Sequence, residues 1–347
     1  GVEQTGTSCV AEFLVGFPVH YALSTNSRPY RRTATNSRLS SSTTTMIKSK
    51  ALLSRTCLFK ESRSFSEYRR SLSTKLEPIK MSFTSYESAA DGGQKPPIII
   101  MHGLFGCKSN WNSLSKSLHN MTRRKVITVD ARNHGDSPHT LEQSYQLMAE
   151  DVKYLMEDLG VKKASLIGHS MGGRTMMYLA VIYPELVESL IPVDISPINS
   201  KEVSDIQSII DVLRGVNLDI NGPISKVRKL ADEHMKSSIE SPVLRQFLLT
   251  NLIEVDRKYQ WRINIESINV NFKNNLAVFP PVQSTYNGQT YFIGGGDSLF
   301  LKPSDHEAIK QIFPSVKFDY IPGAGHWLHA EKPQEFLKLV SQFLATV

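Results

Sequence analysis

The sequence has little cysteine, no long apolar run and almost no net charge beyond its first eighty residues. Its three cysteines cannot form a disulfide framework, and only Cys107 lies beyond residue 80. No stretch approaches the roughly 18 apolar residues of a membrane-spanning helix. The formal charge of +7 belongs to residues 1–80, where eight Arg and five Lys face five Glu, so the remaining 267 residues sum to −1. Such a body argues against nucleic-acid binding, which needs basic residues gathered on the folded domain.

Residues 1–79 are predicted to be a disordered N-terminal region that carries a mitochondrial transit peptide. Residues 13–60 contain eight Lys or Arg and no acid, and Ser40–Thr45 consists of Ser and Thr alone. This composition buries too little apolar surface to offset its ordering entropy. We predict that Met46 is the initiator. The sequence that follows it is basic, rich in Ser and poor in acidic residues, as transit peptides are. We therefore expect a mitochondrial location, in the matrix. The alternative is a basic tail that carries no targeting signal.

The body, residues 80–347, alternates short apolar runs with amphipathic stretches. Strands are predicted at Pro97–Met101, Val126–Asp130, Ala164–Gly168, Leu190–Asp194, Thr290–Gly294 and Lys317–Ile321. Helices are predicted at Asn110–Asn120 and Gln143–Leu159, from Ser170 to Tyr183, and at Pro333–Leu344. This alternation predicts an α/β fold with a mostly parallel central sheet covered by helices on both faces. Pro192 predicts that its strand begins there or lies at an edge.

Residues 198–288 interrupt the alternation and are predicted to form a helical cap over the carboxyl edge of the sheet. They contain helix-periodic segments at Val203–Leu213, Ile224–Met235 and Val243–Leu252, and no clear strand. A cap at this edge would decide the shape of the substrate.

Ser170 is the candidate nucleophile because it stands in the pattern G-x-S-x-G at Gly168–Gly172. An apolar strand precedes the pattern and a helical stretch follows it, which is the context of a nucleophile elbow. Glycines around the serine leave space for so sharp a turn. The start of the helix would add backbone N–H donors for an oxyanion. The alternative is an ordinary glycine-rich turn.

The segment His102–Gly106 (HGLFG) directly follows the first predicted strand. A motif of this kind supplies a backbone N–H to the oxyanion hole of hydrolases that have a nucleophile elbow. We assign the two oxyanion donors to the backbone N–H groups of Leu104 and Met171, each worth roughly 3 kcal/mol at the transition state. His102 is predicted to order the loop, and Cys107 to have a packing role.

His326 is the candidate general base, because Gly323–Trp327 follows the last predicted strand and its glycines let the loop fold back over the sheet. His329 is the only close rival in the sequence. Solvated or core roles are predicted for three other histidines, His134, His139 and His234.

Two aspartates are candidates for the acid that orients the base. Asp297 follows the strand Thr290–Gly294, the usual place for the acid in the chain order Ser–acid–His. Asp194 ends the strand Leu190–Asp194, and Glu266 in the insertion is a less favoured third candidate. Carboxylates at either strand end can reach the histidine loop, so the residues alone leave both aspartates open.

Together these motifs resemble the α/β-hydrolase family. The sequence around and between these motifs resembles one subgroup, that of the mitochondrial alpha/beta-hydrolase domain-containing protein 11 and its bacterial esterase relatives. The resemblance covers about Gly92 to Phe343 and includes the insertion. It is carried by HGLFG (His102–Gly106), VDARNHGDSPH (Val129–His139), GHSMGGR (Gly168–Arg174), VDISP (Val193–Pro197), KLADE (Lys229–Glu233), LLTNL (Leu248–Leu252), WRIN (Trp261–Asn264) and AGHW (Ala324–Trp327).

The resemblance implies a mitochondrial serine ester hydrolase that acts on acyl esters, lipid-like acylglycerols among them, without a cofactor or metal. It supports Ser170 and His326. In the bacterial relatives the acid stands at the VDIS position, so the resemblance favours Asp194 and keeps Asp297 as the alternative. The loop Asp130–Ser137 is expected to be structural and to brace the oxyanion loop.

Other functions remain compatible with these residues. An acyl-thioester or protein-acyl hydrolase would use the same three side chains with a different cap pocket. A mainly protein-binding role in a mitochondrial complex would need none of the chemistry. The expected partner is a small acyl ester, with no nucleic acid, no membrane span and a mitochondrial protein as the alternative partner.

Overall fold

The computed structural model describes residues 77–88, 95–198 and 204–347. The predicted transit peptide and Met46 lie outside these residues. The backbone oxygen of Glu77 accepts a hydrogen bond from Arg132, and the Ile79 N–H donates to Asp151. The chain therefore already contacts the domain just before the predicted boundary at residue 80.

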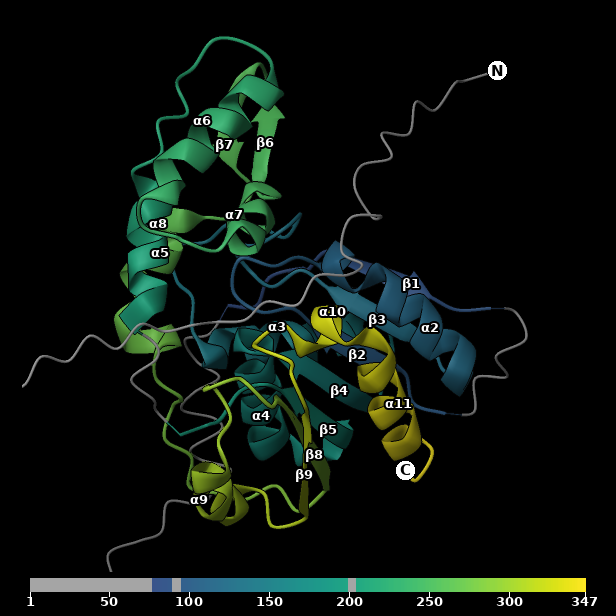
Figure 1. Cartoon of the computed structure of the whole chain (residues 1–347). Helices are drawn as coiled ribbons and strands as arrows, with labels where there is room; N and C mark the ends of the chain where they lie inside the picture. Colours follow the sequence, from purple (N-terminus) through teal and green to yellow (C-terminus); the bar gives the residue numbers. More distant parts are fainter. Residues whose placement is uncertain (1–76, 89–94, 199–203) are drawn as a thin grey trace, which may run out of the picture. The chain divides into compact units, whose positions relative to one another are not determined.

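A seven-stranded sheet forms the centre of the described domain, in the order β1-β3-β2-β4-β5-β8-β9 (Figure 1). Neighbouring strands are parallel except β1, which pairs antiparallel with β3 at one edge. The strands are β1 (Phe83–Tyr86), β2 (Ile98–Met101), β3 (Val126–Val129), β4 (Ala164–His169), β5 (Val187–Val193), β8 (Gln289–Gly295) and β9 (Val316–Ile321). The predicted α/β class and mostly parallel sheet are confirmed.

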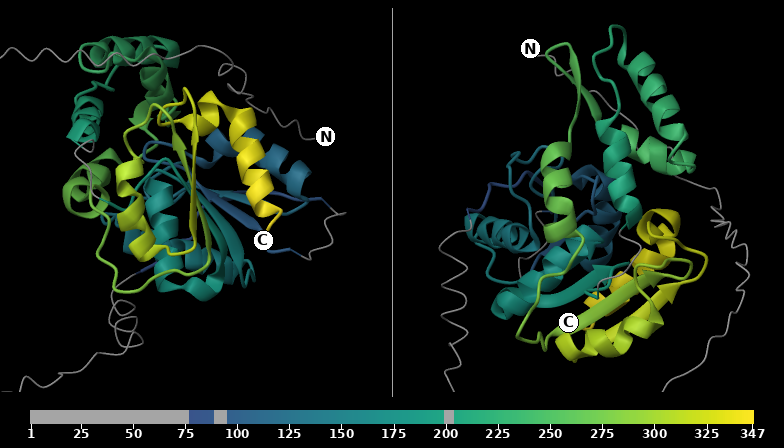
Figure 2. Two further views of the ribbon diagram at one scale, coloured as in Figure 1. Left: turned by 60° about the horizontal axis from the view of Figure 1, so that its bottom comes forward. Right: turned by 90° about the vertical axis from the view of Figure 1, so that its left-hand side faces the viewer.

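Helices cover both faces of the sheet (Figures 1 and 2). Those outside the cap are α2 (Asn112–Thr122), α3 (Tyr145–Asp158), α4 (Met171–Ile182), α9 (His306–Ile312), α10 (Leu328–Glu331) and α11 (Pro333–Leu344). Alternate residues of a strand point to opposite faces, so Ile98 and Ile100 of β2 share one side. There they join a buried cluster with Trp111, Leu118 of α2 and Phe336 of α11. Burial of such side chains is worth roughly 2–3 kcal/mol each, which holds the scaffold rigid beneath the loops.

Pro192 lies inside a central strand, so the prediction that it marks a start or an edge was wrong. β5 begins at Val187 and is flanked by β4 and β8. Its pairing with β8 runs through Ser189 and Leu190 and resumes at Val193. Proline lacks an N–H, and the gap in this ladder spans Pro192, so the missing donor costs little there.

The cap contains strands as well as helices, so the prediction of an insertion without a strand was also wrong. Its elements are α5 (Ser204–Arg214), α6 (Ile224–Lys236), α7 (Pro242–Leu249), β6 (Leu252–Val255), β7 (Lys258–Trp261), α8 (Ile265–Asn271) and a π-helical turn (Phe272–Leu276). β6 and β7 form a two-stranded antiparallel hairpin. Its turn, Asp256–Arg257, has positive φ at both residues, the backbone that two-residue hairpins prefer, in residues other than the usual Asn-Gly.

The cap is attached to loops at the carboxyl edge of the sheet. Asn133, which follows β3, accepts a hydrogen bond from the Asn264 N–H at 2.9 Å and donates through its side chain to Ser267. Tyr145 of α3 donates its hydroxyl to the backbone oxygen of Leu276 at 2.6 Å. The insertion therefore lies over the edge at which the candidate site residues end.

Candidate active site

Ser170 occupies a strained turn between β4 and α4. Its φ of 51° and ψ of −114° fall outside the helical and extended regions. Its N–H donates to the backbone oxygen of Val193, and only 8% of the residue is exposed. A Cβ on Gly168 would lie 2.3 Å from the Gly172 oxygen, and one on Gly173 would lie 2.5 Å from Ile195. Glycine is thus required around the serine for close approach.

Gly172→Ala is expected to destabilise the domain by about 3 kcal/mol or more, because the new Cβ would lie 2.4 Å from the Met101 oxygen and 2.7 Å from that of His102. Both atoms belong to backbone that cannot move without shifting β2. Urea unfolding measures the loss. Gly215→Ala is the control, since its nearest contact is the end of the His234 side chain at 3.2 Å. Equal stability of the two variants would contradict the prediction.

Backbone strain is concentrated where four neighbouring strands end. Phe105, Asn133, Ser170 and Asp194 all have positive φ, between 48° and 64°, and follow β2, β3, β4 and β5 respectively. Each such residue costs of order 1–3 kcal/mol, and strain of this kind clusters at functional sites. The carboxyl edge of the sheet beneath the cap is therefore the place in the described domain where this strain indicates a functional site.

His326 and Asp194 are brought together across the edge of the sheet. His326 Nδ1 lies 2.7 Å from Asp194 Oδ2, although the residues are 132 positions apart. The Asp194 carboxylate is fully buried and also accepts hydrogen bonds from the Gly295 N–H, at 2.9 Å, and from the Ser298 hydroxyl. These donors hold the carboxylate in place with one oxygen aimed at the imidazole.

Two neighbouring rings pack against the His326 imidazole. The Phe300 ring packs on it with centroids 4.0 Å apart, and the ring of His169 lies 4.7 Å away. His169 Nε2 also contacts the His326 backbone oxygen at 2.8 Å. Gly103 faces His169 at a distance that excludes any side chain, since a Cβ there would lie 2.6 Å from Nδ1. One buried histidine thus contacts both the loop of the candidate base and the oxyanion loop, a role that sequence reasoning missed.

The other candidates lie elsewhere. Asp297 is exposed, and its backbone N–H bonds to the Ala324 oxygen. Glu266 is an exposed cap residue paired with Arg214 at 3.0 Å. His329 is buried, stacks on Trp111 with centroids 4.3 Å apart, and has no described partner for Nδ1. None of the three contacts His326 through a hydrogen bond within the described residues. His139 and His234 are exposed, and His134 is buried.

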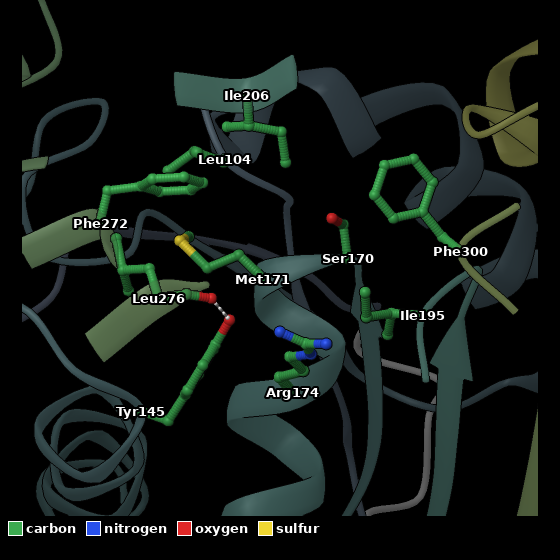
Figure 3. Close-up of a pocket in the computed structure, with 10 residues that line it drawn as sticks. All are labelled: Leu104, Tyr145, Ser170, Met171, Arg174, Ile195, Ile206, Phe272, Leu276 and Phe300. Atoms are coloured by element: carbon green, nitrogen blue, oxygen red, sulfur yellow. Dashed lines mark hydrogen bonds between the residues drawn. The ribbon is translucent and has the colours of Figure 1, made fainter. Parts of the chain in front are cut away.

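The residues of the two assigned oxyanion donors lie beside the serine. Leu104 and Met171 line the same pocket as Ser170 (Figure 3). Neither backbone N–H donates to another residue in the described part of the chain. Unpaired N–H groups at a helix start and in a loop can donate hydrogen bonds to a developing oxyanion without reorganising.

The oxyanion loop is braced from below by buried neutral histidines. His102 Nε2 accepts from the Ala131 N–H at 3.1 Å, and His134 Nε2 accepts from the Phe105 N–H at 3.3 Å. Burial lowers the pKa of His102, and burial, with a smaller electrostatic effect of the neighbouring His102 ring, lowers the pKa of His134 to about 3. From the cap, Asn251 donates to the Phe105 oxygen at 2.8 Å. The peptide groups beside Leu104 are therefore fixed by both domain and cap.

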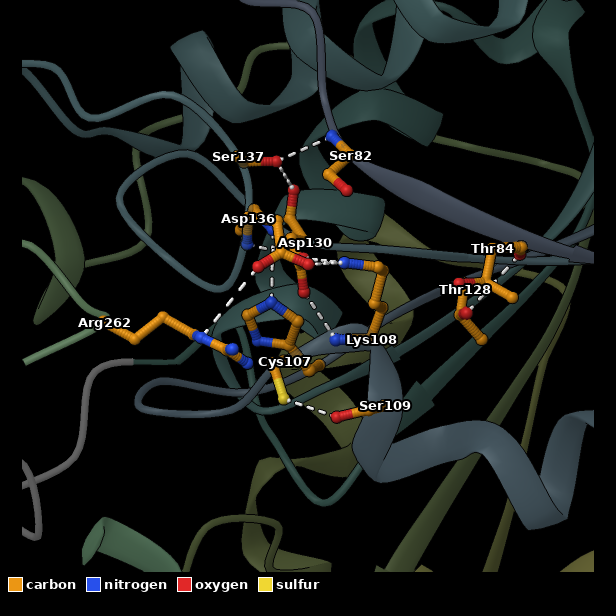
Figure 4. A network of polar contacts seen from close by, with 12 residues as sticks. Ser82, Thr84, Cys107, Lys108, Ser109, Thr128, Asp130, Asp136, Ser137 and Arg262 are labelled. Atoms are coloured by element: carbon orange, nitrogen blue, oxygen red, sulfur yellow. Dashed lines mark hydrogen bonds and ion pairs between the residues drawn. The ribbon is translucent and has the colours of Figure 1, made fainter. Parts of the chain in front are cut away.

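A charged network ties this loop to the one after β3 (Figure 4). Lys108 Nζ contacts Asp130 at 2.6 Å and Asp136 at 2.5 Å, and the Lys108 N–H also donates to Asp130. Burial lowers the pKa of Lys108, and the two aspartates outweigh it, so that the net shift is upward. Cys107 lies beside this network with its sulfur 3.0 Å from the Ser109 hydroxyl. The Asp130–Ser137 loop thus braces the oxyanion loop.

Acidification is expected to destabilise the domain, because the folded state holds four histidines in the neutral form. Burial lowers the pKa of His102 and His134, lowers that of His169 strongly, and takes that of His329 to about 3. The unfolded chain protonates these groups from about pH 6.5 downward while the folded chain does not. The free energy of unfolding should therefore fall as pH drops below about 6.5, by up to about 1.4 kcal/mol per unit for each histidine.

Urea unfolding at pH 7.5 and pH 5.0 measures this loss. His329→Phe keeps a ring on Trp111 and removes one titrating group, so its unfolding free energy should depend less steeply on pH. A stability that is unchanged between the two pH values would contradict the assignment of neutral histidines.

Ten residues line the pocket above Ser170, and most are apolar (Figure 3). Core and cap both contribute, and the lining consists of Leu104, Tyr145, Ser170, Met171, Arg174, Ile195, Ile206, Phe272, Leu276 and Phe300. The described residues contain no group of three or more His, Cys, Asp or Glu arranged for a metal ion. In the same residues no helix is long and apolar enough to cross a membrane.

Comparisons with known proteins agree with this fold. The pattern of the alpha/beta hydrolase fold family matches residues 96–212. The mouse sn-1-specific diacylglycerol lipase ABHD11 is 42% identical over 270 residues, 78% of this chain and 87% of that protein. A putative esterase/lipase of Haemophilus influenzae is 34% identical over 72% of this chain and 83% of its own length. A marine microorganism esterase superposes with a TM-score of 0.70 at 32% identity, covering 76% of this chain and 99% of that one. The resemblance expected from the sequence motifs is confirmed.

Proposed function

The chain belongs to the alpha/beta hydrolase family, and from this membership we propose that it is a serine hydrolase that cleaves carboxylic esters of acyl groups. Ser170 is the nucleophile, His326 the general base and Asp194 the acid that orients it. The observation that carries the proposal is the contact of His326 Nδ1 with the buried Asp194 carboxylate, on a loop that reaches back to the strained serine turn.

The proposed reaction has two steps. Ser170 Oγ attacks the ester carbonyl carbon while His326 Nε2 takes its proton, and the negative oxygen is bound by the N–H groups of Leu104 and Met171. The alcohol leaves with the proton from His326. Water, activated by the same imidazole, then cleaves the acyl-enzyme and frees the acid. No Ser170–His326 hydrogen bond is made among the described residues, as is common before substrate binds.

Asp194 is the better acid on geometric grounds. Its carboxylate accepts from the imidazole, whereas the side chain of Asp297 is exposed and makes no hydrogen bond to a histidine among the described residues. The imidazolium formed during attack would be compensated by the one charge fixed beside it. Asp194 therefore supports the proposed triad, and Asp297 is the alternative that mutation must exclude.

Acylglycerols are the substrate class we propose to test first. Relatives of this chain are named as diacylglycerol lipases. In this chain, the apolar lining of the pocket favours binding of an acyl chain. The test is hydrolysis of a diacylglycerol and of short alkyl esters by the purified full chain. Ser170→Ala should abolish release of acid from all of them. Hydrolysis that persists in this variant would refute the proposal, and preference for matched acyl thioesters would redirect it to a thioester hydrolase.

The mitochondrial targeting signal is a separate proposal. It rests on the basic, acid-poor composition of residues 13–60. Fusion of residues 46–79 to a fluorescent protein should direct the fusion to mitochondria. A diffuse fusion protein would leave the segment as a basic tail.

A further inference from the structure

Arg174 places a buried guanidinium at the wall of the candidate active site (Figure 3). Only 3% of the residue is exposed, and it lines the same pocket as Ser170. It stands four residues after the serine on α4, one helical turn away, so the two side chains begin roughly 5–6 Å apart. A full positive charge therefore lies within reach of a short group attached to Ser170.

The guanidinium of Arg174 donates to three backbone oxygens, and the Tyr145 hydroxyl is a further hydrogen-bonding neighbour. Nε donates to Ser196 at 3.0 Å, one terminal nitrogen to Ala277 at 3.0 Å and the other to Ile198 at 3.3 Å. These bonds fasten both ends of the cap to α4. They neutralise no charge, because every one of these acceptors is a neutral oxygen.

Arg174 differs in this respect from the other buried arginines of the described domain. Arg124 pairs with Glu188, Arg132 with Asp151 at 2.7 Å, and Arg245 with Asp232 at 2.9 Å. Among the described residues no carboxylate lies within ion-pair distance of Arg174. A buried charge without a counter-charge is costly, and the fold avoids that cost at each of the other three positions.

The rest of the pocket offers no substitute for a carboxylate. The Tyr145 hydroxyl donates to the Leu276 oxygen and is a hydrogen-bonding neighbour of Arg174, but burial raises its pKa and it carries no charge. The remaining lining apart from Ser170 is aliphatic, aromatic or Met171. The Asp194 carboxylate is engaged by His326, Ser298 and the Gly295 N–H. The counter-charge that Arg174 lacks is therefore absent from every described group that faces the pocket.

We propose that the missing carboxylate belongs to the substrate: the pocket takes esters whose acyl chain ends in a second carboxylate, and Arg174 binds that group. This inference rests on the proposed ester hydrolysis. The distal carboxylate takes no part in the bond changes: Ser170 bonds the carbonyl carbon, the alcohol leaves with the proton held by His326, and water releases a dicarboxylate. About three or four carbon–carbon bonds span one helical turn, which points to short half-esters.

The test compares two substrates in one enzyme preparation, so that any loss of folded protein cancels in their ratio. Monomethyl glutarate carries the carboxylate, and methyl 5-methylhexanoate replaces it by an isopropyl group of the same shape. Methyl esters are used because a carboxylate expels aryloxide leaving groups without enzyme. The kcat/KM of each is measured for the full chain, Arg174→Met, Arg174→Lys and Ser170→Ala.

We expect the full chain to prefer the glutarate ester at least tenfold. The ratio should fall to about one or below in Arg174→Met and recover in part in Arg174→Lys. A wild-type preference for the neutral ester would overturn the inference while leaving the proposed hydrolysis intact, and so would a ratio that Arg174→Met leaves unchanged; Arg174 would then serve only to fasten the cap. Failure to cleave either methyl ester by protein that hydrolyses a diacylglycerol would overturn this inference alone, and failure to hydrolyse any of these esters would remove the proposed function as well.

Discussion

Asp194→Asn is expected to lower kcat by roughly 10⁴, the size of loss seen when the acid of a Ser-His-Asp triad becomes an amide. Asp194 Oδ2 accepts from His326 Nδ1 at 2.7 Å. An amide can present its NH₂ to that nitrogen, which would favour the tautomer that has no free lone pair facing Ser170. It would also remove the charge that stabilises the imidazolium. KM should change little, because Asp194 does not line the substrate pocket.

Asp297→Asn is the matched control for this prediction. The two aspartates follow neighbouring strands, β5 and β8, and the substitution is chemically the same. Asp297 is exposed, so its amide should leave kcat near that of the unchanged protein. Steady-state hydrolysis of one short ester by both variants gives the comparison. The reverse ranking would show that the carboxylate after β8 is the acid.

His326→Gln is expected to lower kcat by roughly 10⁵ to 10⁶, because the serine would lose the group that takes its proton. The residual rate would come from the N–H donors of Leu104 and Met171 and from binding alone. Glutamine can still bond to Asp194, so the fold at the carboxyl edge should be retained. Thermal unfolding of the variant checks this separately from turnover.

His329→Phe separates the base from its close neighbour in the sequence. His329 stacks on Trp111 with its ring planes 1° apart, and phenylalanine keeps a ring there. Its Nδ1 has no described partner, so removing the nitrogen leaves nothing unsatisfied. We expect this variant to keep kcat within about threefold of the unchanged protein. A loss as large as that of His326→Gln would mean that His329 acts in the reaction.

Local sequence patterns predicted the scaffold well where local physics decides the structure. The helix Pro333–Leu344 was predicted with its observed bounds, and the serine turn was placed between its strand and helix. Both carry strong local signals, an amphipathic period in one case and closely spaced glycines in the other. The β6–β7 hairpin was missed because its turn, Asp256–Arg257, lacks the glycine that marks such turns.

The candidate site was predictable in its parts and not in its contacts. Ser170 and His326 stand in motifs that can be read along the chain. The choice between Asp194 and Asp297 depends on which strand end faces the histidine loop, and periodicity does not contain that information. The same holds for Asn251, which holds the oxyanion loop from the cap, and for Arg174, whose charge is unusual only once its neighbours are known.

The central claim, that Ser170 is an activated nucleophile, is tested most directly by labelling the full chain with a fluorophosphonate. The reagent bonds covalently to a serine only where a base activates its hydroxyl and an oxyanion hole binds the phosphoryl oxygen. The structure predicts one label per folded chain, mapped by peptide analysis to Ser170 and absent from Ser170→Ala. Folded protein that takes up no label, or that is labelled equally in the alanine variant, would contradict the account.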